Sequence, residues 1–245
     1  MSEQTSRLSR IRSIIAQRMH DSLATTAQLT SVVEVDVTDI MDARRARGAE
    51  FKAEHGVSLS PFAVIARAAV LALAEHPLLN ARIDVEEGTM TQFPEVNLGV
   101  AVDTEAGLLV PNIKSAQELD VVGLAGAIAG TAEKARGRGL KPADLEGGTF
   151  TLTNTGSRGS ILDTPILNAP EVGILATGAV ERRPIAVGEV GSETVQVRDC
   201  AYLCLTYDHR LVDGADAARY LGTVKDLLES GRLLAELGLT VSAAR

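Results

Sequence analysis

The sequence contains no tryptophan, and aromatic residues make up only 3% of its 245 positions. The core must therefore be built from aliphatic side chains. Hydrophobic residues make up 45% of the chain, which is enough to fill the interior of one or two ordinary domains. Small apolar side chains suit the packing of helices on a sheet. A chain that is disordered along its whole length is excluded.

Basic residues are outnumbered by acidic ones: the chain has 24 Lys and Arg and 32 Asp and Glu, which gives a net charge of −8. A protein that neutralises many phosphates usually has the opposite balance. The longest apolar run, Pro61 to Ala74, is interrupted by Arg67 and is shorter than the ~20 residues that cross a bilayer. The first ten residues, MSEQTSRLSR, lack the apolar region of an export signal. We expect no nucleic-acid partner, no membrane span and a cytoplasmic location.

Cysteine is scarce, and its two copies, Cys200 and Cys204, lie close together in a segment that is typical of a strand. Their side chains would point to one face about 13 Å apart, too far for a disulfide bond. Without a histidine cluster they also fall short of the four ligands of a structural zinc site. We interpret both as small buried hydrophobic residues and expect no metal.

The periodicity of the hydrophobic residues predicts a mixture of helices and strands. One amphipathic helix carries Ile11, Ile14, Ile15, Met19 and Leu23 on one face. Further helices are predicted from Thr38, from Pro61 behind the N-cap candidate Ser60, from Val121 to the GRGLKP segment, and from Ala215 to about Glu229. Strands are predicted over 29–37, 96–102, 108–113, 149–156, 171–180 and 195–208, with a strand, turn and strand over 81–93.

This order mixes hairpins with crossovers, so we expect one domain of the α/β class, with a mixed sheet and helices in two layers. The chain has neither a GxGxxG nor a GxxxxGK[ST] phosphate loop. Dinucleotide-binding and P-loop proteins therefore lose their main support in the sequence.

Three of the four histidines have structural explanations. His20 falls on the exposed side of the first helix, His55 in a turn and His76 before a proline that ends a helix. His209 instead ends a predicted strand and precedes RLVDG and a helix. A histidine at such a turn can serve as a general base. The spacing equally fits a structural turn in which Asp213 caps the helix and Gly214 eases the backbone.

The segment around His209 resembles the active-site motif of the dihydrolipoamide acyltransferases, the core subunits of 2-oxoacid dehydrogenase complexes. The motif here is YDHRLVDG. Other segments match the family in the same order: IRSIIAQRMHDS, HPLLNARI, VNLGVAVDTEAGLLVPNI, GGTFTLTNTG and TPILNAPEVGILATGAV. The resemblance runs from about Ile11 to Leu239. It implies a polar arm over residues 1–10 and an acyltransferase catalytic domain over residues 11–245.

The resemblance implies roles for three catalytic residues. His209 is similar in position to the general base that takes the proton from the thiol of coenzyme A or dihydrolipoyl. Thr153 matches the hydroxyl residue that donates a hydrogen bond to the tetrahedral oxyanion. Asp213 matches the motif's orienting carboxylate, with Arg18 as a candidate partner. Holding the segment in shape is the favoured role for Asp213.

Coenzyme A contacts are implied for Arg45, Ser60, Asp103, Asn154 and Gly178, which match family positions near the pantetheine and nucleotide. Alternatives stay open for several of them. Ser60 also fits an N-cap, Asp103 a turn and Gly178 a strand glycine that allows close approach of the backbone. Arg45 fits a solvated charge on a helix surface.

The implied fold is similar to that of chloramphenicol acetyltransferase, in trimers whose active sites lie between subunits, with His209 of one facing Thr153 of its neighbour. The implied reaction moves an acetyl group between dihydrolipoyl and coenzyme A. Its implied partners are the other enzymes of the complex and a separate lipoyl domain, since no lipoyl domain and no domain for binding the other enzymes is recognised in the sequence. Succinyl or branched-chain transfer, antibiotic acetylation, a purely structural core and assembly of trimers into a cage are the alternatives.

Overall fold

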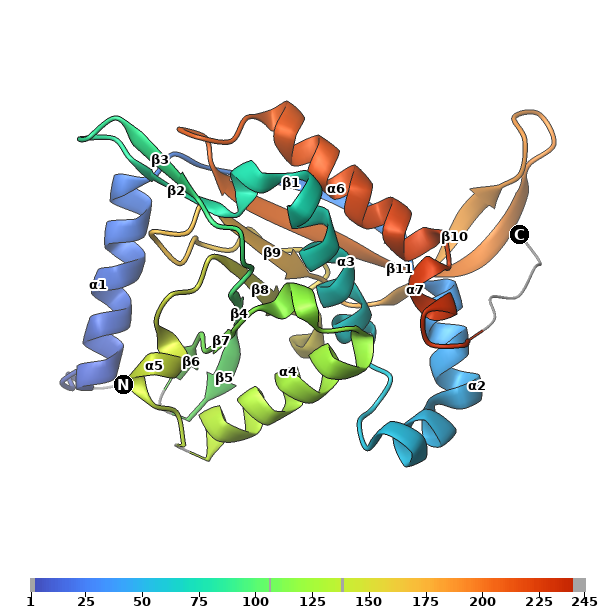
Figure 1. Ribbon diagram of the computed structural model, residues 1–245, viewed down its shortest axis with the longest axis horizontal. Helices are drawn as coiled ribbons and strands as arrows, with labels where there is room; N and C mark the ends of the chain where they lie inside the picture. The colour runs from blue at the N-terminus through green and yellow to red at the C-terminus, as the bar shows by residue number, and fades with distance from the viewer. Residues whose placement is uncertain (1–2, 106, 138, 240–245) are drawn as a thin grey trace.

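The computed structural model describes residues 3–105, 107–137 and 139–239. Its centre is a seven-stranded mixed sheet in the order β1-β11-β9-β8-β4-β7, with β10 beside β11 (Figure 1). The β4–β8 and β8–β9 pairs are parallel and the other pairs are antiparallel. The strands of this sheet are β1 (Gln28–Asp36), β4 (Leu98–Val100), β7 (Asn112–Ile113), β8 (Phe150–Asn154), β9 (Gly173–Thr177), β10 (Glu181–Val187) and β11 (Thr194–Asp208).

The described residues also form seven α-helices, two of which pack closely on one face of this sheet. The helices are α1 (Arg10–Thr25), α2 (Thr38–His55), α3 (Pro61–Glu75), α4 (Val121–Arg136), α5 (Pro142–Leu145), α6 (Gly214–Glu229) and α7 (Arg232–Ala235). Two small hairpins join β2 (Ala81–Asp84) to β3 (Thr89–Gln92) and β5 (Val102–Thr104) to β6 (Gly107–Leu109). Single 3₁₀ turns occur at η1 (Pro77–Leu79), η2 (Ala116–Glu118) and η3 (Gly156–Arg158). The expected α/β class, with a mixed sheet covered by helices, is confirmed.

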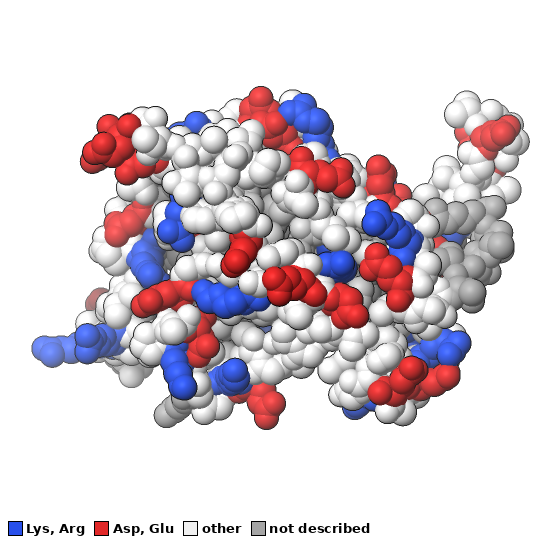
Figure 2. Space-filling model, in the orientation of Figure 1, with Lys and Arg blue, Asp and Glu red and all other residues white. Residues whose placement is uncertain are grey.

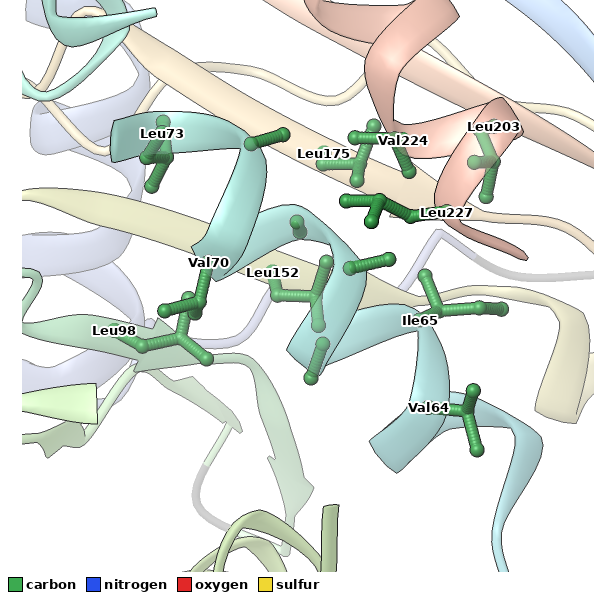
Figure 3. Packing of buried hydrophobic residues seen from close by; sticks show 14 of the residues in the cluster. Val64, Ile65, Val70, Leu73, Leu98, Leu152, Leu175, Leu203, Val224 and Leu227 are labelled. Carbon is green, nitrogen blue, oxygen red and sulfur yellow. The ribbon is translucent and has the colours of Figure 1, made fainter. Parts of the chain in front are cut away.

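The hydrophobic core lies between the sheet and the helices α3 and α6. Alternate side chains of a strand point to one face, so β8, β9 and β11 present a continuous aliphatic surface to both helices. Because small residues occupy much of α3, that helix packs deeply, and nine of its residues are buried. Figure 3 shows this packing around Val64, Ile65, Val70, Leu73, Leu98, Leu152, Leu175, Leu203, Val224 and Leu227.

Three strand predictions differ from the structure. The segment 96–102 divides into β4 and β5, so Asp103 lies inside β5 instead of in the turn. The segment 108–113 likewise divides, into the end of β6 and β7. The strand β10 was not predicted, because Pro184 lies in its middle. Proline cannot donate a ladder hydrogen bond and is tolerated only at a sheet edge, and β10 pairs with β11 alone. Together they form the hairpin that projects from the body in Figure 1.

The first helix is confirmed, but this chain covers its apolar face only in part: Ile15 and Met19 are half-buried. Ser22 is its only buried residue among those described. Ile11, Ile14 and Leu23 are between 42% and 53% exposed. The periodicity of the apolar residues predicts that one face of the helix is buried, but not whether it packs against this chain or against another one.

The two cysteines are free and buried in β11, as predicted. Burial raises the pKa of the Cys200 thiol to about 11. The reactive thiolate is therefore suppressed, and both side chains act as hydrophobic residues.

Surface charge is mixed. Figure 2 shows Lys and Arg interspersed with Asp and Glu over the face it displays, without a broad area of one sign. None of the helices in the described ranges combines the length and hydropathy needed to cross a membrane.

Candidate active site

His209 follows directly after the last residue of β11 and is exposed at the end of the sheet. Its backbone N–H donates to the carbonyl of Ala27 at 2.8 Å, and the N–H of Asp208 donates to the carbonyl of Val172 at 3.0 Å. The ring of Tyr207 lies 5.6 Å from the imidazole, centroid to centroid. The backbone that presents the histidine is therefore fixed from both neighbouring strands.

Asp208 and Arg210, on either side of the histidine, form an ion pair that the sequence reasoning missed. The guanidinium of Arg210 donates from Nε at 3.0 Å and from Nη2 at 2.6 Å to the buried carboxylate of Asp208. Burial opposes ionisation, but the hydrogen bonds from Arg210 and from the N–H of Ala27 lower the pKa of Asp208 below its ordinary value. A bidentate pair of this kind stiffens the turn. The charged residues flanking His209 were the available signal.

Asp213 caps α6. Its carboxylate accepts a hydrogen bond from the N–H of Asp216 at 2.8 Å, and the two residues form a reciprocal capping box. This hydrogen bond lowers the pKa of Asp213. No ion pair joins Asp213 to Arg18 in the described part of the chain. The geometry supports the role in holding the turn after His209 in shape.

A pocket of about 210 Å³ lies at the opposite end of the sheet, where β8 and β9 end and α3 begins. Three of the five predicted coenzyme A contacts line it, namely Ser60, Asn154 and Gly178. The other lining residues are Arg44, Pro61, Phe62, Ile65, Gly156, Ser157, Thr177, Ala179 and Val180. The structure thus brings together segments that are far apart in the sequence, and they line one pocket with both polar and apolar side chains.

Ser60 and Gly178 are placed there for different reasons. Ser60 occupies the N-cap position of α3, but its hydroxyl makes no capping hydrogen bond, so it is available to a ligand. At Gly178, a Cβ atom would lie 1.8 Å from the carbonyl oxygen of Ile161. Only glycine allows the two backbones to approach this closely.

Arg45 and Asp103 are engaged elsewhere. Arg45 pairs with Asp42 at 2.6 Å and with the buried Asp199 at 2.8 Å. Asp103 pairs with Arg158. Neither lines the pocket, whereas Arg44, the other half of the Arg-Arg pair, does. The sequence alone could not show which of the two adjacent arginines faces the pocket. Neighbouring residues on a helix point in different directions, so the answer depends on the exact orientation of α2 about its axis.

Thr153 is half-buried in β8, and its hydroxyl makes no hydrogen bond with a described residue. Across the sheet it pairs with Ala176, which pairs with Cys204. His209 lies five residues beyond Cys204, which is about 17 Å along the strand at the usual rise. An odd number of residues also places the two side chains on opposite faces. One chain therefore cannot bring His209 and Thr153 to the same reacting atom.

Glu171 is a buried acid that the sequence reasoning did not single out, although it lies in the quoted segment TPILNAPEVGILATGAV. It is 2% exposed. Burial raises the pKa of its carboxyl to about 7, although hydrogen bonds from Thr151 and Asn168 and the charge of Arg82 act in the opposite direction. The signal available in the sequence was a glutamate at the start of an apolar strand.

Replacing Glu171 with glutamine should make stability less dependent on pH. The folded protein holds this proton up to about pH 7, whereas an unfolded glutamate releases it near 4.5. The contribution of Glu171 to stability therefore falls as the pH rises through this window, and it does not recover above it. Glutamine has no proton to lose. Between pH 6 and pH 8.5 the Glu171→Gln protein should gain about 1.4 kcal/mol relative to wild type.

Urea unfolding of both proteins at the two pH values measures this difference, since every other titrating group is shared. An equal stability difference at both pH values would show that Glu171 titrates normally.

The sequence matches the family model of the 2-oxoacid dehydrogenases acyltransferase catalytic domain over residues 1–235. This chain belongs to that acyltransferase family. It is 45% and 48% identical to the dihydrolipoyllysine-residue acetyltransferase components of the pyruvate dehydrogenase complexes of Corynebacterium glutamicum and Mycobacterium bovis, over 96% of its length. It spans only 35% and 43% of those two proteins. The succinyltransferase component of the Bacillus subtilis 2-oxoglutarate dehydrogenase complex is 40% identical over 91% of the chain and 52% of that protein.

Solved structures agree with the family assignment. The cubic core of a pyruvate dehydrogenase multienzyme complex superimposes with a TM-score of 0.88 at 32% identity, over 95% of this acyltransferase-family chain and 94% of that one. Azotobacter vinelandii dihydrolipoamide acetyltransferase, whose catalytic mechanism was investigated at a serine, a histidine and an asparagine, has the same score and coverage at 31% identity. Chloramphenicol acetyltransferase gives 0.54 at 16% identity over 92% of this chain and all of that one, which confirms the expected fold.

Proposed function

We propose that this domain transfers an acetyl group between a dihydrolipoyl group and coenzyme A, within a pyruvate dehydrogenase complex. The observation that carries the proposal is the placement of His209, exposed at the end of β11 with its backbone fixed by hydrogen bonds on both sides. A general base must be both accessible and held in position. The two acetyltransferase relatives support acetyl as the acyl group.

In the proposed mechanism His209 takes the proton of the coenzyme A thiol. The thiolate attacks the carbonyl carbon of the acetyl-dihydrolipoyl thioester, and the hydroxyl of Thr153 donates a hydrogen bond to the resulting oxyanion. The carbon–sulfur bond to dihydrolipoyl then breaks, and the departing sulfur receives the proton from His209. Asp213 holds the turn after His209 through its cap on α6.

The pocket lined by Ser60, Asn154 and Gly178 is the proposed entry for coenzyme A. Arg45 and Asp103 stay predicted contacts, and each would have to exchange an ion pair for the ligand. The lipoyl group would arrive on a separate domain. No group of three or more His, Cys, Asp or Glu in the described residues could hold a metal ion, and the mechanism uses none.

We further propose that the active unit is a homotrimer. The separation of about 17 Å between His209 and Thr153 along the sheet supports a site that is completed by a second chain. The exposed apolar residues of α1, Ile11, Ile14 and Leu23, support it independently. A larger cage is the alternative, since one similar structure is a cubic core. The other enzymes of the complex, a cytoplasmic location and a catalytic domain over residues 11–245 remain predictions from the sequence.

The decisive experiment measures acylation of coenzyme A with acetyl, succinyl and isobutyryl dihydrolipoamide in parallel. The proposal predicts the highest kcat/KM for acetyl. A preference for succinyl would favour the alternative acyl group, which the succinyltransferase relative represents. Absence of transfer with all three donors would contradict the proposal and leave antibiotic acetylation or a structural role.

Mixing two inactive proteins should restore activity. If His209 of one subunit works with Thr153 of its neighbour, every mixed trimer of His209→Ala and Thr153→Ala chains contains one interface with both residues intact. Random exchange at equal amounts would recover about a quarter of the wild-type sites. Native mass spectrometry verifies the exchange, and activity is measured before and after it. No recovery in proven mixed trimers would assign both residues to the same subunit's site.

A further inference from the structure

Glu171 lies at the same end of the sheet as His209. The register of β9 and β11 pairs Gly173 with Tyr207, and the N–H of Asp208 donates to the carbonyl of Val172 at 3.0 Å. The next step along the two strands places Glu171 opposite His209. Neighbouring strands are about 4.8 Å apart, so the two backbones are adjacent.

The carboxyl of Glu171 reaches away from His209 to the next strand, β8. Its Oε2 accepts a hydrogen bond from the hydroxyl of Thr151 at 2.5 Å, and its Oε1 accepts one from Nδ2 of Asn168 at 3.0 Å. Gly148 makes room for it, because a Cβ atom there would lie 2.6 Å from Oε1. The side chain is thus fixed at both oxygens within a glycine-lined space.

The segment that carries Glu171 is tied to the rest of the site at its other end as well. The carbonyl of Leu167 accepts from the hydroxyl of Ser22 on α1 at 2.7 Å, and its N–H donates to the side chain of Gln28 on β1 at 3.0 Å. Residues 167–172 therefore join α1, β1, β8 and the end of β11, and Glu171 provides the attachment to β8.

We propose that Glu171 is a positioning residue for His209. Its carboxyl holds the segment 167–172 against β8. The hydrogen bond from the N–H of Asp208 to the carbonyl of Val172 then fixes the backbone next to the histidine relative to this segment. The consequence for turnover rests on the proposed function, whereas the consequence for the position of the imidazole does not. Glu171 does not touch the reacting atoms.

The surroundings indicate that the neutral acid is the form that fits. Oδ1 of Asn112 on β7 is buried without a hydrogen-bond partner in the described residues. It would lie 2.4 Å from the same Cβ position on Gly148 that faces Oε1 of Glu171. Two oxygens that both accept hydrogen bonds can point into the same space favourably only when one of them carries a proton that it donates to the other. Among the described residues, the charge that acts on this carboxyl from a neighbouring element is that of Arg82 on β2.

Two variants separate reach from charge. Glu171→Asp keeps an ionisable carboxyl but shortens the side chain, so that it cannot reach both Thr151 and Asn168. Glu171→Gln keeps the reach of the neutral acid, and its amide can still form a hydrogen bond with the hydroxyl of Thr151. Anchorage predicts a loss of kcat of about ten-fold to a hundred-fold for Glu171→Asp and little change for Glu171→Gln. An electrostatic role predicts the reverse order.

The KM for coenzyme A should not change in either variant, because the proposed pocket lies at the opposite end of the sheet. Gly148→Ala is the second test, since its added methyl displaces the unaltered carboxyl and should lower kcat as Glu171→Asp does. Glu189→Ala, at an exposed site in the turn of the β10–β11 hairpin, is the matched control.

A readout without turnover is the ring signal of His209 in NMR spectra of the histidine-labelled protein. In Glu171→Asp and Gly148→Ala it should shift or broaden, while the signals of His20 and His55 stay in place, and in Glu171→Gln it should coincide with wild type. An unchanged His209 signal in both disrupting variants would overturn the proposal. If wild type transfers no acyl group, the proposed function fails and this signal alone decides the role of Glu171.

Discussion

Replacing His209 with alanine is expected to lower kcat by a factor of about 10²–10⁴, the usual contribution of a positioned general base. The thiol of coenzyme A is largely protonated at neutral pH and attacks a thioester slowly without a base to take its proton. The side chain is exposed, and its backbone hydrogen bond to Ala27 does not depend on the imidazole. The fold should therefore be unaffected, which circular dichroism and the melting temperature can verify.

His20→Ala is the matched control for this variant, since His20 is exposed on α1 and makes no hydrogen bond with a described residue. It should retain wild-type turnover. A folded His209→Ala protein with near-normal acyl transfer would exclude His209 as the base, and the site would then have to be sought elsewhere.

Thr153→Val should lower kcat by a factor of about 10²–10³, because it keeps the shape of the side chain and removes the hydroxyl that stabilises the oxyanion. The ground-state affinity for coenzyme A should change little, since the interaction forms only in the transition state. Thr153→Ser is the matched control, because it keeps the hydroxyl and should retain most of the turnover. Steady-state kinetics with varied coenzyme A separate the two parameters.

Packing alone gives a different expectation for Thr153. Valine favours a strand at least as strongly as threonine. If Thr153→Val showed unchanged turnover, the residue would serve only the packing of β8, and the oxyanion donor would remain to be identified. A rise in KM with constant kcat would instead assign the hydroxyl to uniform binding of substrate.

Local features of the chain were predictable from the sequence. The alternation of Val33, Val35 and Val37 predicted β1, which the structure confirms over Gln28–Asp36. The Ser60-Pro61 step predicted the start of α3, and Asp213 the start of α6. These signals are local, because caps, turns and side-chain periodicity act over one or two turns of backbone. The position of His209 at a strand end followed from the same kind of signal.

Contacts between distant segments were not predictable in this way. The choice between Arg44 and Arg45 at the pocket, the ion pair of Asp103 with Arg158 and the burial of Glu171 all depend on which elements pack together. The missed strand β10 has the same origin, because only the pairing with β11 makes an edge position available for Pro184. Tertiary context overrides local preference in each case.

The sequence by itself determined the class of fold, the family and the residue types available for the chemistry. Only the tertiary structure decided that the exposed histidine and the half-buried threonine lie at different ends and faces of one sheet. The reason is that side-chain periodicity specifies which face of each element is apolar, whereas the register and order of the strands specify the distances between elements. Those distances leave the reacting atom out of reach of one chain and make a second chain part of the proposed site.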